Sequence, residues 1–479
     1  MNDNEIKEYL MQTLNTTPEL IKNKLATNKK IKKREVYYEL KNKIDRFLKE
    51  DTEIRFFTMP GIRGTGKTTI LYQLYDHLYN ENKINNKQIL YLDLERLKNN
   101  GPYNLLNYLD IYIKDINEDN YYNNEPMFIF IDESQYANNW GSVGKVIFDE
   151  TTKVFLIFTG SDALNLESDI YTYRRSLKKE IYPLNFKEYL HLKYGIKFQN
   201  NIKDTFYKLI FTGEVEPAIK LENTIKLNQF METNRNMNKE WENYLKYGEF
   251  PFFINKKQGE IHDLTLNVKN SVIEKDIDTI HSFNSQTRLI TYQLLNILAL
   301  QKPADISHEK LANTLDTSKK TISNVLNVLE KTELIFHIEP YGSGTKRNRK
   351  SWEYYFISTQ IKSSIIQDSG IATSNINEYN EILLKNHVAS TLFKMKKELK
   401  PNFGLFYDTR KGGVNFIIKT LMGDTIPIEV GIGKKNKKQI KNSINKYNSK
   451  YGIIISNKTS IIEKEDNIIY IPPLTFSLI

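Results

Sequence analysis

With 479 residues, 40% of them hydrophobic and 26% charged, the chain is too long for one hydrophobic core and has the composition of a soluble, multidomain protein. It has no run of roughly 18 apolar residues and no export signal, so we expect a cytoplasmic protein that binds no membrane. Because it has no cysteine and no closely spaced histidines, we expect no disulfide, thiolate nucleophile or cysteine-bound zinc. The net charge of +10 suits a polyanionic partner, but lysine is abundant throughout, so only local basic clusters are informative.

The first 50 residues predict charged, amphipathic helices that lead into the next domain. Val36, Leu40, Ile44 and Leu48 recur at a spacing of three to four residues, which indicates one buried helix face. The basic run at 29–34 precedes this face, and a solvated helix surface is its simplest interpretation.

Residues 51–190 predict a parallel α/β domain. Four short, β-rich apolar runs are separated by helical patterns, at Ile54–Met59, Ile89–Leu94, Met127–Ile131 and Val154–Phe158. This alternation is typical of a parallel sheet covered by helices.

A glycine-rich loop lies between the first predicted strand and a helix that continues through Ile70, and it fits the phosphate-binding P-loop pattern at every fixed position. The residues expected to bind ATP there are Gly61, Ile62, Arg63, Gly64, Thr65, Gly66, Lys67, Thr68 and Thr69. In such a loop the backbone N–H groups surround the β-phosphate, Lys67 bridges the β- and γ-phosphates, and Thr68 ligates Mg²⁺. The sequence therefore predicts an ATP and Mg²⁺ site.

The apolar run Met127–Ile131 is followed directly by two acids, Asp132 and Glu133. This arrangement predicts that Asp132 holds magnesium through water and that Glu133 polarises the attacking water. Together with Lys67, Glu133 is the expected catalytic residue for ATP hydrolysis.

Polar residues after the fourth predicted strand provide further candidates. Thr159 or Ser161 is expected to sense the γ-phosphate, with a turn or helix cap as the alternative. Arg174 and Arg175 are candidates for a cation that stabilises the transition state in a neighbouring subunit, and a solvated surface is their alternative.

Residues 191–285 predict a helical lid or connector, and 286–360 predict a winged helix. In the latter, three helical segments are followed by two strands joined by a basic turn. Its candidate DNA-binding residues are Lys319, Lys320, Lys346, Arg347 and Arg349. Since winged helices also dock proteins, double-stranded DNA and a protein partner both remain open.

In combination, these motifs resemble the prokaryotic AAA-like ATPases of the archaeal-ATPase group. The resemblance rests on Gly61–Thr68, Ile131–Tyr136 with Trp140, Thr159–Ser161, Tyr182–Leu190, Tyr247–Pro251 and Glu274–Ile277. It extends from about residue 35 to the C-terminus, and it implies a winged helix and a C-terminal restriction-endonuclease-like domain, which here would occupy 375–479.

The C-terminal segment departs from the nuclease pattern that the resemblance implies. Lys385 stands where a helix glutamate would be, Asn415 replaces an aspartate, and Gly431 stands in place of the lysine after Glu429. Lys434 is the nearest substitute for that lysine. Because one remaining acid binds magnesium poorly, we expect this domain to be an inactive nuclease that binds or packs.

The sequence as a whole predicts an α/β multidomain ATPase that couples its nucleotide state to a winged helix and a C-terminal domain, which contact DNA, a protein partner or another copy of the chain. Two alternatives remain open: an ATP-gated DNA nuclease of a defence system, and a DNA-binding regulator that uses ATP only as a ligand.

Overall fold

The computed structural model forms two compact units, residues 1–182 and 183–479. It describes residues 2–26, 32–50, 52–99, 101–160, 174–199, 201–231, 234–277, 283–301, 307–344, 351–370, 376–399, 403–432 and 437–479. Within these ranges, no helix is long and apolar enough to cross a membrane.

The first unit is built on a five-stranded parallel sheet with the strand order β2-β3-β4-β1-β5. The strands are β1 (Phe56–Pro60), β2 (Ile89–Asp93), β3 (Met127–Asp132), β4 (Val154–Gly160) and β5 (Leu177–Lys178). All residues of β1, β3 and β4 are buried, as expected for a parallel sheet that is covered on both faces. The predicted parallel α/β sheet is thus confirmed.

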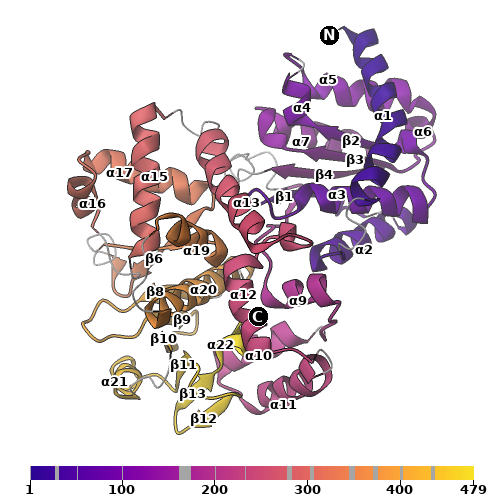
Figure 1. The fold of residues 1–479 in the computed structure, drawn as a ribbon. Helices are drawn as coiled ribbons and strands as arrows, with labels where there is room; N and C mark the ends of the chain where they lie inside the picture. The colour runs from indigo at the N-terminus through magenta and orange to yellow at the C-terminus, as the bar shows by residue number, and fades with distance from the viewer. Residues whose placement is uncertain are drawn as a thin grey trace. The chain divides into compact units, whose positions relative to one another are not determined.

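Helices cover both faces of this sheet (Figure 1). They are α1 (Asp3–Ala26), α2 (Glu35–Lys49), α3 (Lys67–Asp76), η1 (His77–Glu81), η2 (Asn86–Gln88), α4 (Leu94–Asn99), α5 (Leu105–Asp110), η3 (Ile111–Ile116), α6 (Glu118–Tyr122), η4 (Ser134–Tyr136) and α7 (Trp140–Glu150). One apolar core lies under α4, α5 and α7, and a second lies under α2 and α3.

The N-terminal helices belong to the first unit instead of leading into it. Ile6, Leu10 and Leu14 of α1 pack into the first core, while Ile21 packs into the second together with Val36 of α2. Helix α1 therefore contributes side chains to both cores, which is more than the lead-in segment that the sequence predicts.

The second unit begins with a helical region. Its elements are α9 (Phe186–Tyr194), α10 (Ile202–Thr212), α11 (Glu216–Ile225), η5 (Lys226–Phe230), α12 (Met237–Tyr247), η7 (Pro251–Phe253), α13 (Gln258–Ser271), η8 (Val272–Asp276), α15 (Ser285–Leu300), α16 (His308–Thr314) and α17 (Lys319–Lys331). Helices α16 and α17 pack against each other, and α17 also contacts α15. A β-hairpin of β6 (Ile335–Pro340) and β7 (Glu353–Phe356) follows α17.

An eight-stranded mixed sheet completes the second unit, with the order β12-β13-β11-β10-β9-β8-β6-β7. The elements are β6 (Ile335–Pro340), β7 (Glu353–Phe356), α19 (Thr359–Asp368), α20 (Ile376–Glu398), β8 (Phe403–Tyr407), β9 (Phe416–Thr420), β10 (Thr425–Gly431), α21 (Lys437–Tyr447), β11 (Gly452–Ser456), β12 (Glu463–Glu465), β13 (Ile468–Ile471) and α22 (Pro473–Phe476). The expected α/β multidomain class is thus confirmed.

This sheet crosses the boundary that the sequence predicts between residues 360 and 375. Glu339 and Pro340 of β6 pair in parallel with Phe406 and Tyr407 of β8. The hairpin expected to form the wing and the expected nuclease-like segment therefore share one backbone hydrogen-bond network, instead of forming a separate C-terminal sheet.

Candidate active site

Strands β1, β4 and β3 bring their carboxyl ends together at one edge of the first sheet. In their register, Pro60 lies beside Gly160 and Phe158 lies beside Ile131. The loop after β1, the end of β4 and the acids after β3 consequently meet in space, although the loop is distant from the other two segments along the chain, as is usual at the carboxyl edge of a parallel sheet.

The loop after β1 has the backbone geometry of a phosphate-binding turn. Gly64 and Gly66 have φ angles of 82° and 93°, in the left-handed region that favours glycine. The Thr65 hydroxyl donates to the Ile62 carbonyl at 2.9 Å and closes the turn. Helix α3 begins directly after it at Lys67, so the positive end of its dipole lies at the loop.

Gly61 is required by a close backbone approach. A Cβ atom at this position would lie 2.3 Å from the Ile181 carbonyl oxygen. The Ile181 N–H donates to the Pro60 carbonyl at 2.8 Å, and the Gly61 N–H donates to Gly160 at 3.2 Å. The segment that leaves the first unit therefore runs against the first residue of the loop.

Lys67 is buried and its ammonium group lies within the loop. Its Nζ donates to the Gly61 carbonyl at 2.6 Å and to the Ile62 carbonyl at 3.2 Å. Thr68 and Thr69 follow in the first turn of α3 and are half-buried. Lys67 and Thr68 thus lie at the helix N-terminus, where an anion is stabilised.

Arg34 supports the loop from behind and was not expected to do so. It is 8% exposed, and its guanidinium donates to the Thr65 carbonyl at 2.7 Å and to the Tyr182 carbonyl at 3.1 Å. The interpretation of the basic run at 29–34 as a solvated helix surface is wrong for Arg34, because these carbonyls hold its side chain inside the unit.

Asp132 is 2% exposed and accepts hydrogen bonds from three groups. The Tyr91 hydroxyl donates to it at 3.1 Å, the Glu133 N–H donates at 3.2 Å, and the Thr159 hydroxyl also donates. Burial, and then the Asp132 charge, raise the pKa of Tyr91, so this tyrosine remains a proton donor. The structure thus places the sensor candidate Thr159 directly beside the predicted metal ligand.

Glu133 lies at the beginning of the turn after β3, in a left-handed conformation with φ of 54°. Its carboxylate forms an ion pair with Arg63 across 3.7 Å and accepts a hydrogen bond from Gln135. The predicted catalytic acid is therefore held from the loop side and from its own turn.

The edge beside Asp132 is acidic. Asp93 lies opposite Asp132 in the register of β2 and β3. Burial raises the pKa of Asp93, and repulsion from Glu133 and Glu95 raises it further. Asp132 offers a carboxylate and Thr68 a hydroxyl group, which are oxygen donors of the kind that Mg²⁺ takes, so the chemistry of these two side chains fits Mg²⁺.

The remaining candidates in this unit lie apart from the edge or outside the described residues. Ser161 is not among the described residues. Arg174 is exposed, and Arg175 donates to Asp149 of α7 at 2.6 Å. Their proposed action on a neighbouring subunit remains a prediction.

The DNA-binding candidates Lys319 and Lys320 are exposed in the first turn of α17, after the N-cap Ser318. The other three, Lys346, Arg347 and Arg349, lie outside the described residues.

The residues at the positions of the nuclease pattern, which are the substituted Asn415 and Lys385 and the remaining acid Glu429, make contacts within the fold. The Asn415 amide oxygen accepts from the Val430 N–H at 2.7 Å, and the buried Glu429 accepts from Gln439 at 3.1 Å. Lys385 pairs with Glu353 across 3.7 Å. These contacts connect neighbouring elements, whereas Lys434 lies outside the described residues.

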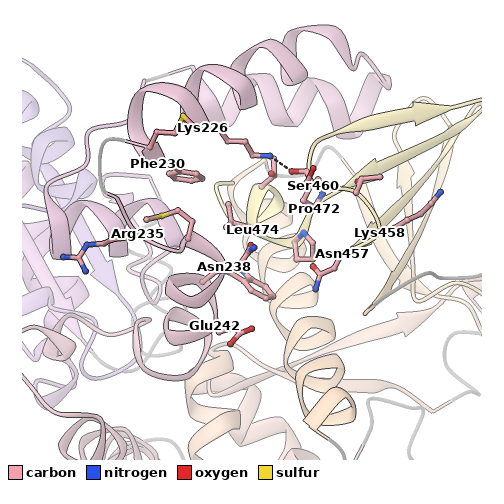
Figure 2. A pocket seen from close by; sticks show the side chains of 16 residues that line it. Lys226, Phe230, Arg235, Asn238, Glu242, Asn457, Lys458, Ser460, Pro472 and Leu474 are labelled. Atoms are coloured by element: carbon pink, nitrogen blue, oxygen red, sulfur yellow. Dashed lines mark hydrogen bonds between the residues drawn. The ribbon is translucent and has the colours of Figure 1, made fainter.

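A cavity of about 840 Å³ lies in the second unit, between the segment 226–242 and the residues after β11 and β13 (Figure 2). Phe230 and Leu474 line it, and the Lys226 ammonium group donates to the Ser460 carbonyl at its rim. None of the predicted site residues lines this cavity.

The sequence did not single out Arg34 or Tyr91, although both contact the site. Tyr91 resembles any other apolar strand residue, and the strand register alone brings it to Asp132. For Arg34, the one signal was its position immediately before an amphipathic helix.

Two family models match the chain. Residues 54–190 match an AAA domain, which confirms the AAA-like part of the resemblance. Residues 238–365 match a domain of unknown function.

Relatives of this chain occur in archaea and bacteria. The uncharacterized protein MJ1637 of Methanocaldococcus jannaschii is 34% identical over 475 residues, covering 99% of this chain and 94% of its own. An uncharacterized protein of Haemophilus influenzae is 25% identical, covering 62% and 65%. Among solved structures, the Walker-type ATPase PABY2304 of Pyrococcus abyssi is 13% identical with a TM-score of 0.41, covering 70% and 95%.

Arg34→Ala should lower the free energy of unfolding of the first unit by about 2–4 kcal/mol, because the buried Thr65 carbonyl and the part-buried Tyr182 carbonyl lose charged donors. Urea unfolding in a Trp241→Phe, Trp352→Phe background, where fluorescence reports Trp140 alone, measures this. The matched control, Lys32→Ala, removes an exposed charge two residues away and should change stability by less than about 0.5 kcal/mol. Equal effects of the two substitutions would contradict the supporting role of Arg34.

Proposed function

The chain belongs to the same protein family as the M. jannaschii protein MJ1637 and contains an AAA domain, and from this premise we propose that it is an ATPase whose nucleotide state acts as a switch. The observation that carries the proposal is the meeting of the phosphate-binding turn, Lys67 and the acids Asp132 and Glu133 at one sheet edge. Each is a part that phosphoryl transfer requires.

The site residues divide the chemistry among them. The backbone N–H groups of 63–68 and the Lys67 ammonium group bind phosphate oxygens, and the α3 dipole adds to this attraction. Thr68 and Asp132 would hold Mg²⁺, which when bound neutralises charge on the phosphates. Glu133 orients and polarises the water that attacks the terminal phosphate, and Thr159 connects its backbone to Asp132.

The acidic edge favours hydrolysis over mere binding. A protein that uses ATP only as a ligand needs no carboxylate directly after the metal ligand, yet Glu133 is present there, next to the buried Asp132. An acid in this place contributes to water activation and not to ground-state binding.

Glu133→Gln should lower the rate of phosphate release at least about 100-fold and leave ATP affinity within about threefold, because only proton transfer to the acid is lost. Lys67→Ala should weaken ATP binding at least about tenfold through the loss of a charged donor. Phosphate release and fluorescent-nucleotide titration measure the two effects, with the exposed Glu118→Gln as the control for removing an acid. A wild-type protein that binds ATP but never turns it over would leave only the ligand-sensing alternative.

For the second unit, we propose that α15 to α17 and the hairpin β6–β7 act as a winged helix that contacts duplex DNA. Ser318 caps α17, and the next two residues present exposed lysines, while the opposite helix face is buried through Ile322, Val325 and Leu329. An exposed basic first turn on a helix anchored by its other face suits contact with phosphates.

The double substitution Lys319→Ala, Lys320→Ala should weaken duplex binding about equally for all DNA sequences and reduce the slope of log affinity against log salt by about 2. Fluorescence anisotropy over a series of KCl concentrations measures this slope. Lys331→Ala, at the far end of the same helix, should leave the slope nearly unchanged. An unaltered slope in the double variant would exclude DNA contact through this turn and favour a protein partner.

A further inference from the structure

Arg63 is a side chain of the phosphate-binding loop, but it contacts the predicted catalytic acid. Its Nη2 atom lies 3.7 Å from Glu133 Oε2, and both side chains are 16% exposed. The same nitrogen lies 3.5 Å from the Tyr136 hydroxyl. The loop and the turn after β3 are therefore joined by a half-buried cation.

The turn that carries Glu133 is held at several points. The Glu133 N–H donates to Asp132 and Thr159, and the Tyr136 N–H donates back to the Glu133 carbonyl at 3.1 Å. The Gln135 side chain donates to the Glu133 carboxylate. Arg63 is the part of this network that comes from the loop.

Tyr136 extends the network to α4. Its hydroxyl donates to Glu95 at 3.3 Å, and burial, followed by the Glu95 charge, raises the pKa of Tyr136. The Lys98 ammonium group lies over its ring at 5.0 Å. Arg63 thus lies between a carboxylate that it contacts and a second carboxylate that it reaches through Tyr136.

A nucleoside triphosphate bound in the loop would compete with Glu133 for Arg63. The guanidinium belongs to the loop that surrounds the phosphates, and a triphosphate offers several anionic oxygens where Glu133 offers one carboxylate. Arginine binds phosphate in a bidentate, charge-assisted manner, so the stronger anion displaces the weaker one. A diphosphate lacks the terminal group and competes less well.

We propose that Arg63 is a positioning residue that restrains Glu133 until a triphosphate is bound, and that it then exchanges the carboxylate for phosphate and releases the acid. The proposal rests on the proposed ATPase function and deepens it, since it makes water activation conditional on the terminal phosphate. In this proposal Arg63 distinguishes ATP from ADP, whereas the backbone N–H groups of the loop do not.

The test compares the wild-type chain with Arg63→Ala, Arg63→Lys and the control Lys98→Ala, which removes a nearby charge that contacts Tyr136 but not Glu133. Affinities for ADP and the non-hydrolysable analogue AMP-PNP are measured by competition with a fluorescent nucleotide. Amide hydrogen exchange of residues 133–137 reports the state of the turn without depending on turnover.

In the wild-type chain, AMP-PNP should speed exchange at 133–137 relative to ADP. Arg63→Ala should exchange rapidly in this segment in every state, and it should lose about tenfold in AMP-PNP affinity but less than about threefold in ADP affinity. Arg63→Lys keeps the positive charge but lacks the planar, bidentate guanidinium, so its exchange rate and nucleotide affinities should lie between those of the wild type and Arg63→Ala. It serves as the test if the alanine variant does not fold. Lys98→Ala should behave as the wild type.

Equal losses for both nucleotides, or exchange at 133–137 that does not respond to the substitutions, would overturn the role of Arg63 while leaving the ATPase proposal intact. A wild-type chain that binds neither nucleotide would overturn both.

Discussion

The parallel register of β1, β4 and β3 is the constraint on which the rest of the first unit depends. It brings Thr159 beside Asp132, where the hydroxyl bonds the buried carboxylate, and it brings the loop after β1 beside both. A shift of one residue in any of these strands would turn its side chains to the opposite face and separate these groups. Every residue of the three strands is buried, so the polar groups at their carboxyl ends lie at the edge of an apolar sheet.

Arg34 links this edge to the last residue of the first unit. It binds the carbonyl of Thr65 in the loop and the carbonyl of Tyr182, the last residue of the first unit. Gly61 packs against Ile181 beside it. These contacts join the loop to the residue where the chain leaves the first unit, which is a connection that the proposed switch requires.

The sequence alone predicted the strands and turns, because residues adjacent along the chain determine them. The four apolar runs became β1 to β4, and the glycine spacing of the loop became left-handed turns at Gly64 and Gly66. Contacts between segments that are distant along the chain could not be predicted, because hydrophobic periodicity does not reveal which segments pack together. The contacts of Arg34 and Tyr91 and the ion pair of Arg63 with Glu133 are of this kind. The pairing of β6 with β8 could not be predicted for the same reason. It consists of two pairs of residues from segments that are distant along the chain.

We propose that the loop and the acids form one nucleotide site, and a crystal structure of the Glu133→Gln variant with AMP-PNP and Mg²⁺ tests this most directly. We predict phosphates enclosed by residues 63–68, with the metal beside Thr68 and the Asp132 carboxylate. A nucleotide bound elsewhere, or a metal that has neither Thr68 nor Asp132 in its surroundings, would contradict the account.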